Sequence, residues 1–414
     1  MNHPNIKLFL SFLLILAALP IKAQSNTNTI GLKYSIHSEL MKMNRDIQVY
    51  LPSSYQESSK KYPVVYLFDG QRLFSYGVSL AQSFTNFDTG PEFIVVGINH
   101  KEGERNNDFF NKEDELLGFV ERELLPFVDS NFRTNSERVA FGWQYAGSLL
   151  IKALAENPKL FSAYLVASPY PVFGERMESV NQISDERYPS DNIFYLTTSI
   201  NEGVVEKGTD ALEKLLEEKA LKKLDWSYHK LAGESHNTTD YPTIRHGLMR
   251  YFNNYSVLQF NSHDLYLEAG GMPYVVEYFR KRAVRYGFPP EVPNWTKFTL
   301  IRDVMAINNI EQVDLFVKSF KDDFIKQLKL WSSGEIANFY LDNKLYLKAK
   351  KIFQLMADAH PKSAMPINRL GHVYKGLKDR AKAKDYFERS IKLAKASGSG
   401  RLLDYQKDLA GLQK

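Results

Sequence analysis

The chain has 414 residues, of which 44% are hydrophobic and 24% are charged, and its formal net charge is +5. This composition is typical of a folded protein with two or three domains, and it excludes bulk disorder. The absence of cysteine excludes disulfides and a lipid-anchored N-terminal cysteine. The overall charge gives no sign of a nucleic-acid partner.

Residues 1–23 have the form of a cleavable secretory signal. Lys7 precedes an apolar run from Leu8 to Leu19, and the small residue Ala23 precedes a polar stretch. The run is short for a membrane span, so we expect cleavage, no integral membrane segment in the mature chain, and a periplasmic or secreted product. A retained signal anchor is the alternative. Cleavage removes two lysines and lowers the formal net charge from +5 to +3.

Residues 24–255 alternate predicted strands with predicted helices. The continuous apolar runs at 62–68 and 93–98 predict buried strands, and helical spacing appears at 76–84 and 113–127. Such alternation is typical of a mostly parallel, doubly wound α/β sheet. The remaining predicted strands are 30–37, 47–51, 139–141, 163–166, 193–197 and 225–231, and the remaining predicted helices are 145–155, 209–220 and 241–253.

The segment 138–147 has the pattern of a nucleophile elbow, in which a strand passes through a tight turn into a helix. Gly142 and Ala146 stand two residues before and two after Gln144, where the turn tolerates little bulk. Gln144 itself occupies the position of the nucleophilic serine. The pattern therefore predicts a hydrolase scaffold without its usual nucleophile.

The C-terminal part of the chain is predicted to be helical. Residues 256–330 read as short amphipathic helices that connect to a repeat at 331–414. The repeat has the 34-residue period and the small/aromatic pattern of tetratricopeptide units, which predicts binding to a protein partner. A pair of helical hairpins with chance spacing is the alternative. The matched positions are Ile336/Leu370, Ala337/Gly371, Tyr340/Tyr374, Ala349/Ala383 and Phe353/Phe387.

The N-terminal part resembles the putative-esterase family of α/β hydrolases, which includes enterochelin-type siderophore esterases and S-formylglutathione hydrolase-like esterases. The resemblance covers most of residues 30–255 and extends to family members with a helical-repeat tail. It implies an α/β-hydrolase fold and a small-molecule ester or siderophore-like ligand. It rests on the segments 49–52, 62–70, 94–98, 123–127, 161–164, 167–169 and 233–237, together with the elbow.

The resemblance also implies roles for individual residues. His236 matches the catalytic histidine, and Glu202 matches the acid that orients it, with Asp210 as an alternative. The N–H of Tyr145 and an N–H from the loop with Gly70 and Gln71 would form the oxyanion hole.

Two functional hypotheses follow from the glutamine at position 144. Its amide is not a nucleophile, which favours a pseudoesterase that binds a ligand or partner. The alternative is an active ester hydrolase in which His236 and Glu202 activate water, or in which another nucleophile acts. Ser148 lies one helical turn beyond Gln144, a poor position for a substitute nucleophile.

The residues around this predicted site give weaker signals. His100, Arg105 and Asp108 follow the strand at 93–98, where they line the mouth of the pocket or belong to an ordinary polar loop. Trp143 is bulky and is expected to fill part of the pocket. No metal-binding spacing of histidines and no nucleotide-binding glycine motif occurs, so we expect no metal and no cofactor.

Overall fold

The computed structural model describes residues 29–186 and 192–413. The predicted signal at 1–23 lies outside the described residues. Among the helices that are described, none is long and apolar enough to cross a membrane.

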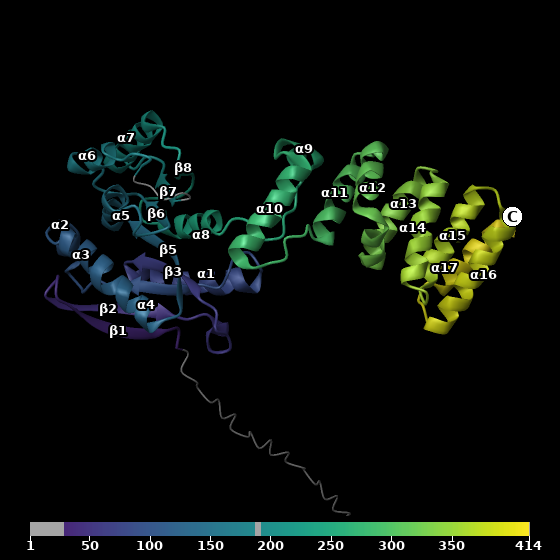
Figure 1. The fold of residues 1–414 in the computed structure, drawn as a ribbon, viewed down its shortest axis with the longest axis horizontal. Coiled ribbons are helices and arrows are strands. Elements are labelled where there is room, and N and C mark those ends of the chain that lie inside the picture. The colour runs from purple at the N-terminus through teal and green to yellow at the C-terminus, as the bar shows by residue number, and fades with distance from the viewer. Residues whose placement is uncertain (1–28, 187–191, 414) are drawn as a thin grey trace, which may run out of the picture. The chain divides into compact units, whose positions relative to one another are not determined.

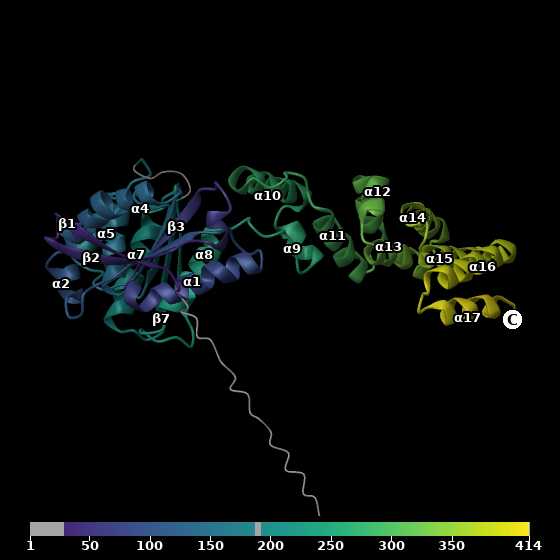
Figure 2. The ribbon, with the colours of Figure 1, turned by 90° about the horizontal axis from the view of Figure 1, so that it is seen from below.

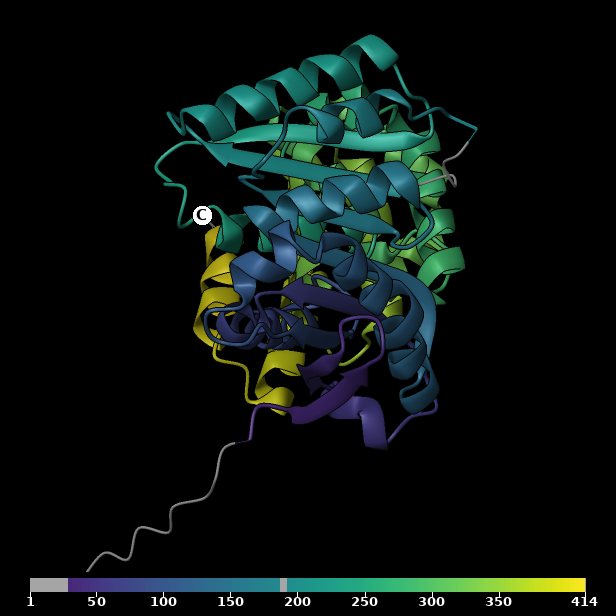
Figure 3. The ribbon, with the colours of Figure 1, turned by 90° about the vertical axis from the view of Figure 1, so that its left-hand side faces the viewer.

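The N-terminal part of the chain forms an eight-stranded sheet in the order β1-β2-β4-β3-β5-β6-β7-β8. The first pairs, β1 with β2 and β2 with β4, are antiparallel, whereas β4, β3, β5 and β6 are mutually parallel neighbours. In Figure 3 the strands run from the purple N-terminal pair at one edge to the teal strands at the other. The strands are β1 (Leu32–Ser38), β2 (Met43–Tyr50), β3 (Tyr62–Phe68), β4 (Ile94–Ile98), β5 (Thr134–Trp143), β6 (Ala163–Ala167), β7 (Asn192–Ser199) and β8 (Leu224–Leu231).

Helices cover both faces of this sheet because its central strands are apolar on both sides. Every residue of β3, β4 and β6 is buried. Phe68 of β3 packs on Phe109 of α2, and its neighbour Leu67 packs on α1, so α1 and α2 lie on opposite faces. Figure 2 shows α1 across the sheet from α4 and α5. The helices are α1 (Gly70–Asn86), α2 (Arg105–Phe110), α3 (Glu113–Phe119), α4 (Leu125–Asn131), α5 (Tyr145–Glu156), α6 (Glu175–Asn181), α7 (Val204–Lys219) and α8 (Asp240–Tyr251), with the short helical turns η1 (Ser53–Gln56) and η2 (Val120–Leu124).

The α/β fold class predicted from the sequence is confirmed. The strand predicted at 139–141 is the buried end of the longer β5, since the residues before 139 are only partly buried and lack the apolar signal. The helix predicted at 113–127 is one helical stretch formed by α3, η2 and α4. Two short helices, α2 and α6, were missed because each has fewer than eight residues and little periodicity.

The chain divides into two compact units. The first contains β1 to β6, α2 to α7 and the start of α1. The second contains the rest of α1, the central part of β7 (Ile193–Thr197) and everything from Asp225 in β8 to the C-terminus.

The helices after α8 belong to the second unit, in which α9 to α15 share one apolar core and the buried side chains of α16 and α17 form two smaller clusters. Val275, Phe298, Val304, Phe353 and Val373 are among its fully buried side chains. Figure 1 shows these helices in green to yellow, stacked in chain order from α11 to α16, and α17 folds back against α16. The helices are α9 (His263–Glu268), α10 (Gly271–Tyr286), α11 (Asn294–Ala306), α12 (Ile310–Gln327), α13 (Leu330–Asp342), α14 (Tyr346–Ala359), α15 (Ala364–Gly376), α16 (Arg380–Ser397) and α17 (Leu402–Gln413).

The repeat extends one helical pair further toward the N-terminus than its sequence pattern indicates. Helices α11 and α12 pack together like α13 and α14, and like α15 and α16. Each pair turns through a residue with positive φ, which is Asn308, Lys344 or Lys378. The first spacing is 36 residues and the second is 34, and this irregularity conceals the first pair from a search at a constant period.

Candidate functional site

Gln144 occupies the turn between β5 and α5. Its φ of 56° and ψ of −113° lie outside the regions that residues with a side chain normally adopt. The turn is fixed by main-chain hydrogen bonds, because the Gln144 N–H donates to the Ala167 carbonyl at 3.0 Å and the Gln144 carbonyl accepts from Ser148 and Tyr170. The geometry is that of a strained elbow held by its neighbours.

Gly142 allows the strand and the helix of the elbow to approach closely. A Cβ at Gly142 would lie 2.5 Å from the carbonyl carbon and oxygen of Ala146. Only glycine fits here because main-chain atoms of the helix cannot move aside. The glycine two residues before Gln144 therefore serves the turn itself.

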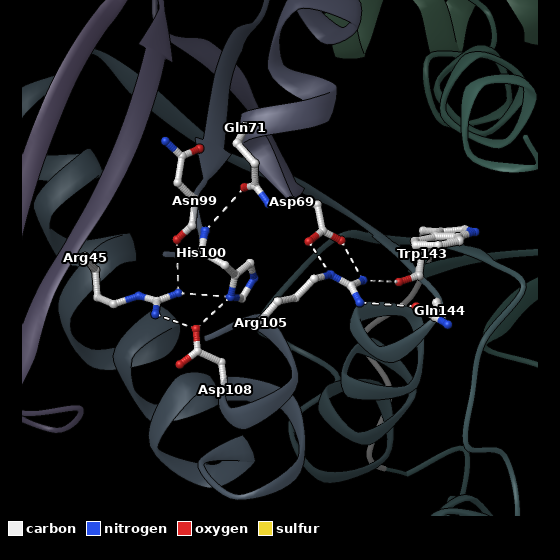
Figure 4. A network of polar contacts seen from close by, with 9 residues as sticks. All are labelled: Arg45, Asp69, Gln71, Asn99, His100, Arg105, Asp108, Trp143 and Gln144. Atoms are coloured by element: carbon white, nitrogen blue, oxygen red, sulfur yellow. Dashed lines mark hydrogen bonds and ion pairs between the residues drawn. The ribbon is translucent and has the colours of Figure 1, made fainter. Parts of the chain in front are cut away.

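The Arg105 guanidinium lies between Asp69 and Gln144 (Figure 4). Its Nε and Nη2 donate to the two carboxylate oxygens of Asp69 at 2.6 and 2.8 Å, which is a bidentate ion pair. Its Nη1 donates to Oε1 of Gln144 at 3.2 Å, and Nη2 also reaches the carbonyl of Trp143 at 3.4 Å. Because Arg105 is a hydrogen-bond donor, it is the carbonyl oxygen of the Gln144 amide that faces Arg105.

Aromatic rings surround the same guanidinium. The Cζ atom of Arg105 lies 5.2 Å from the ring centroid of Phe109 and 5.4 Å from those of Trp143 and Tyr145. Trp143 also packs under Arg72, whose Cζ is 4.6 Å from its ring. Trp143 thus lies beside the elbow in contact with two arginines.

The loop expected to contribute to the oxyanion hole begins α1. Asp69 has a φ of 56°, and a Cβ at Gly70 would lie 2.5 Å from the carbonyl carbon of Gly97, so the loop is pressed against β4. The Oε1 atom of Gln71 accepts from the His100 N–H at 3.3 Å. Tyr145 is the first residue of α5, where helix N–H groups have no partner within the helix.

His100 and Asp108 belong to a buried ionic network next to this loop (Figure 4). Nδ1 of His100 lies 2.7 Å from Oδ2 of Asp108, and Nη1 of Arg45 on β2 donates to the same oxygen at 2.5 Å. Arg45, His100 and Asp108 are all within a few per cent of complete burial. This differs from the expectation that His100 and Asp108 line the mouth of a pocket. Both side chains are buried, where Arg45 forms an ion pair with Asp108 and a hydrogen-bond contact with His100.

The network lowers the pKa of the Asp108 carboxyl below its ordinary value. Burial raises this pKa, but the hydrogen bond from His100 and the charge and hydrogen bond of Arg45 outweigh it. Asp108 therefore carries its charge inside the protein. Since Arg105 and Asp108 both lie on α2, the network also anchors the helix that presents Arg105 to the elbow.

Glu202 lies in the first unit, after β7. Its Oε1 accepts from the Ser168 hydroxyl at 2.8 Å and from the Ser199 N–H. Ser168 follows Ala167, whose carbonyl accepts from the Gln144 N–H. Glu202 is therefore linked to the elbow through Ser168 and its neighbour Ala167. Asp210, the alternative acid, lies within α7.

His236 lies in the second unit, in the loop between β8 and α8. It is half-buried, and its carbonyl accepts from the Thr239 hydroxyl at 3.4 Å. The joint action of His236 with Glu202 and the elbow stays a prediction.

Ser148 is fully engaged in structural contacts. Its hydroxyl donates to the carbonyl of Pro171 at 2.5 Å and accepts from Nε of Arg176 at 3.0 Å. The residue is 2% exposed. These contacts agree with the view that it is a poor substitute nucleophile.

Arg105 is the residue whose role the sequence reasoning missed. Its position in the sequence indicates only a polar loop residue near the pocket, but in the structure it contacts the side chain of Gln144 directly. An arginine and an aspartate in adjacent βα loops of a parallel sheet were the available signal, since such loops meet at one edge.

Comparison with known proteins agrees with this architecture. The family described as "Putative esterase" matches residues 38–239, and a tetratricopeptide repeat family matches residues 367–397. The uncharacterized protein YbbA of Bacillus subtilis is 26% identical over 134 residues, which are 28% of this chain and 54% of that protein. The chain therefore spans about half the length of this curated relative.

Two solved structures have the same fold. An uncharacterised protein from Capnocytophaga ochracea is 18% identical with a TM-score of 0.55, over 92% of this chain and 99% of that one. An IroE-like serine hydrolase from Shewanella oneidensis is 21% identical with a TM-score of 0.51, over 69% of this chain and 97% of that one. At these identities the likeness concerns the fold alone. The segment that matches the family described as "Putative esterase", residues 38–239, includes the elbow between β5 and α5.

Proposed function

We propose that this protein is a catalytically impaired member of the esterase family, which binds a ligand or a protein partner and does not hydrolyse esters efficiently. The observation that carries this proposal is Gln144 at the tip of the elbow, with its amide carbonyl bound by Arg105. A carboxamide nitrogen is delocalised and non-basic, so it cannot attack an ester carbonyl and form an acyl-enzyme that turns over.

The ligand and the partner follow from the two parts of the chain. The family resemblance supports a small-molecule ester or a siderophore-like compound as ligand at the elbow. The helical repeats support a protein partner for residues 331–414, because stacked helical pairs serve as binding surfaces. The signal-like segment at 1–23 supports export to the periplasm or beyond.

A panel of activated and natural esters tests this proposal on the natural chain. We expect turnover no more than about 10³ to 10⁴ above the uncatalysed rate, which is the residual acceleration that triad hydrolases keep without their nucleophile. We expect no change when His236 is replaced by alanine, because without a nucleophile the base has no proton to remove. A rate well above background that falls in His236→Ala, without labelling by a fluorophosphonate, would replace the proposal with the water-activating hydrolase.

A further inference from the structure

The charge of the chain is concentrated in its last helices. Residues 343–414 contain 17 lysines and arginines and 6 aspartates and glutamates, a net charge of +11. The preceding 342 residues therefore have a net charge of −6, since the whole chain is at +5. A positive surface of this density attracts an acidic partner.

The repeat itself contains a neutral version of the same surface. In the α13–α14 pair, the Tyr340 hydroxyl donates to Asp314 of α12 at 2.7 Å. Lys348 forms an ion pair with the same carboxylate, and its Nζ lies 5.7 Å from the Tyr340 ring centroid. One carboxylate thus joins a phenol and an ammonium group.

The next pair has the same tyrosine and lysine but replaces the aspartate. Asp314 stands six residues after the turn residue Asn308, and the residue six after Lys344 is Lys350. Nζ of Lys350 lies 5.5 Å from the ring of Tyr374, which corresponds to Tyr340. A second ammonium group therefore occupies the place of the carboxylate.

Further cations and a second ring complete this arrangement. Lys382, which corresponds to Lys348, lies 5.4 Å from the Tyr374 ring, and Tyr386 stacks on Tyr374 at 5.2 Å with an interplanar angle of 11°. Arg389 lies 4.9 Å from the Tyr386 ring. We call Lys350, Tyr374, Lys382, Tyr386 and Arg389 the Tyr374 cluster.

Two carboxylates of the chain lie close to the Tyr374 cluster. Asp379 is 2.8 Å from Lys382 and caps α16, and Asp385 is 3.6 Å from Arg389. The three cations therefore exceed the neighbouring acids, and Lys350 has no ion pair within the described part of the chain.

We propose that the Tyr374 cluster binds a carboxylate side chain of an acidic protein segment, which takes the position that Asp314 takes at Tyr340. This inference deepens the partner-binding role proposed for residues 331–414 and is independent of the esterase-like site. A protein segment fits better than a nucleic acid, because single-stranded bases need exposed aromatic faces, whereas Tyr374 is 8% exposed and stacked on Tyr386.

Fluorescence anisotropy of the full mature chain tests the proposal. The probe is a fluorescein-labelled peptide of alternating glutamate and alanine, and its glutamine counterpart is the uncharged control. The test variant is Lys350→Glu/Lys382→Glu/Arg389→Glu. The control variant, Lys362→Glu/Lys395→Glu/Lys407→Glu, changes the net charge equally. Lys362 follows the end of α14 and Lys395 lies near the end of α16, whereas Lys350 and Lys382 lie near the starts of these two helices. All three control lysines are exposed.

We expect the natural chain to bind the glutamate peptide and not the glutamine peptide, with an affinity that falls as salt is added. At ~0.15 M ionic strength the screening length is about 8 Å, so only charges close to the bound carboxylate affect its binding strongly. The test variant should therefore lose at least about tenfold in affinity for the peptide, and the control variant less than about threefold. A single Lys350→Gln substitution should give a smaller loss in the same direction.

Three outcomes would overturn the proposal. These are no peptide binding by the natural chain, equal losses in the test and control variants, or tighter binding to single-stranded DNA or to phosphatidylglycerol vesicles than to the glutamate peptide. Circular dichroism of each variant checks that the helices are intact. Because the readout is peptide binding, its failure is separate from any result on ester hydrolysis.

Discussion

Replacing Gln144 with serine is expected to raise ester turnover at least about 100-fold above that of the natural chain. In triad hydrolases the loss of the nucleophile costs up to about 10⁶ in rate, and the remaining site still exceeds water by about 10³ to 10⁴. The elbow that would present the serine is already formed, because Gly142 and the main-chain hydrogen bonds of residue 144 hold the turn. Steady-state hydrolysis of a p-nitrophenyl ester measures the gain.

Two further variants show whether a gain in turnover comes from the serine hydroxyl acting as nucleophile or only from the loss of the glutamine side chain. Gln144→Ala removes the same amide and the same acceptor of Arg105 without adding a hydroxyl, so we expect no gain from it. Gln144→Ser/His236→Ala should lose most of the gain, because the serine then lacks its base. Equal rates in the serine and alanine variants would show that the elbow is not a catalytic frame.

Replacing Asp108 with alanine is expected to lower the free energy of unfolding by about 3 to 5 kcal/mol. The substitution leaves the guanidinium of Arg45 buried without its counter-ion, and a buried uncompensated charge is among the most destabilising defects. Urea unfolding followed by circular dichroism measures the change. Asp114→Ala is the matched control, because Asp114 pairs with Lys152 but its side chain is 82% exposed, and should cost less than about 1 kcal/mol.

The same comparison has a defined pH dependence. The pKa of Asp108 is lowered in the folded state, so its ionic network adds stability above the unfolded pKa of about 4 and loses it as the pH falls through the folded pKa. The difference in unfolding free energy between the natural chain and Asp108→Ala should therefore narrow as the pH drops below about 4. A constant difference across that window would mean that the charge of Asp108 contributes nothing.

The sequence predicted the parts of this fold that depend on local patterns. Residues 62–68 and 94–98 are apolar throughout, which is the requirement for a strand covered on both faces, and both are central strands. The elbow was predictable for a similar reason, because a side chain at Gly142 would collide with the main chain of Ala146 where β5 and α5 approach closely.

Contacts between distant segments were much harder to predict. Arg45 reaches Asp108 across 63 residues, and Arg105 reaches Gln144 across 39, without any local periodicity that marks them. Polar residues after a strand have the same composition whether they face solvent or enter a buried network. Asp69 and Arg105 follow the neighbouring parallel strands β3 and β4. Their opposite charges at the same edge of the sheet are the one sequence feature that indicates their ion pair.

Whole-chain averages also concealed two features of the helical region. A net charge of +5 masks +11 in residues 343–414, since the rest of the chain offsets it. The α13–α14 and α15–α16 pairs follow a strict period of 34 residues, but the α11–α12 pair does not, because the turns at Asn308 and Lys344 are 36 residues apart. The charge of each segment, taken separately, shows the first feature. A repeat period that varies by two residues shows the second.

Intact-protein mass spectrometry of the natural chain after exposure to a fluorophosphonate and to an activated ester is the most direct measurement of the central claim. We predict an unmodified mass for the natural chain, and a single adduct at position 144 for Gln144→Ser treated in parallel. An adduct on the natural chain that maps to any residue beside the elbow would contradict the claim that this protein cannot form an acyl-enzyme.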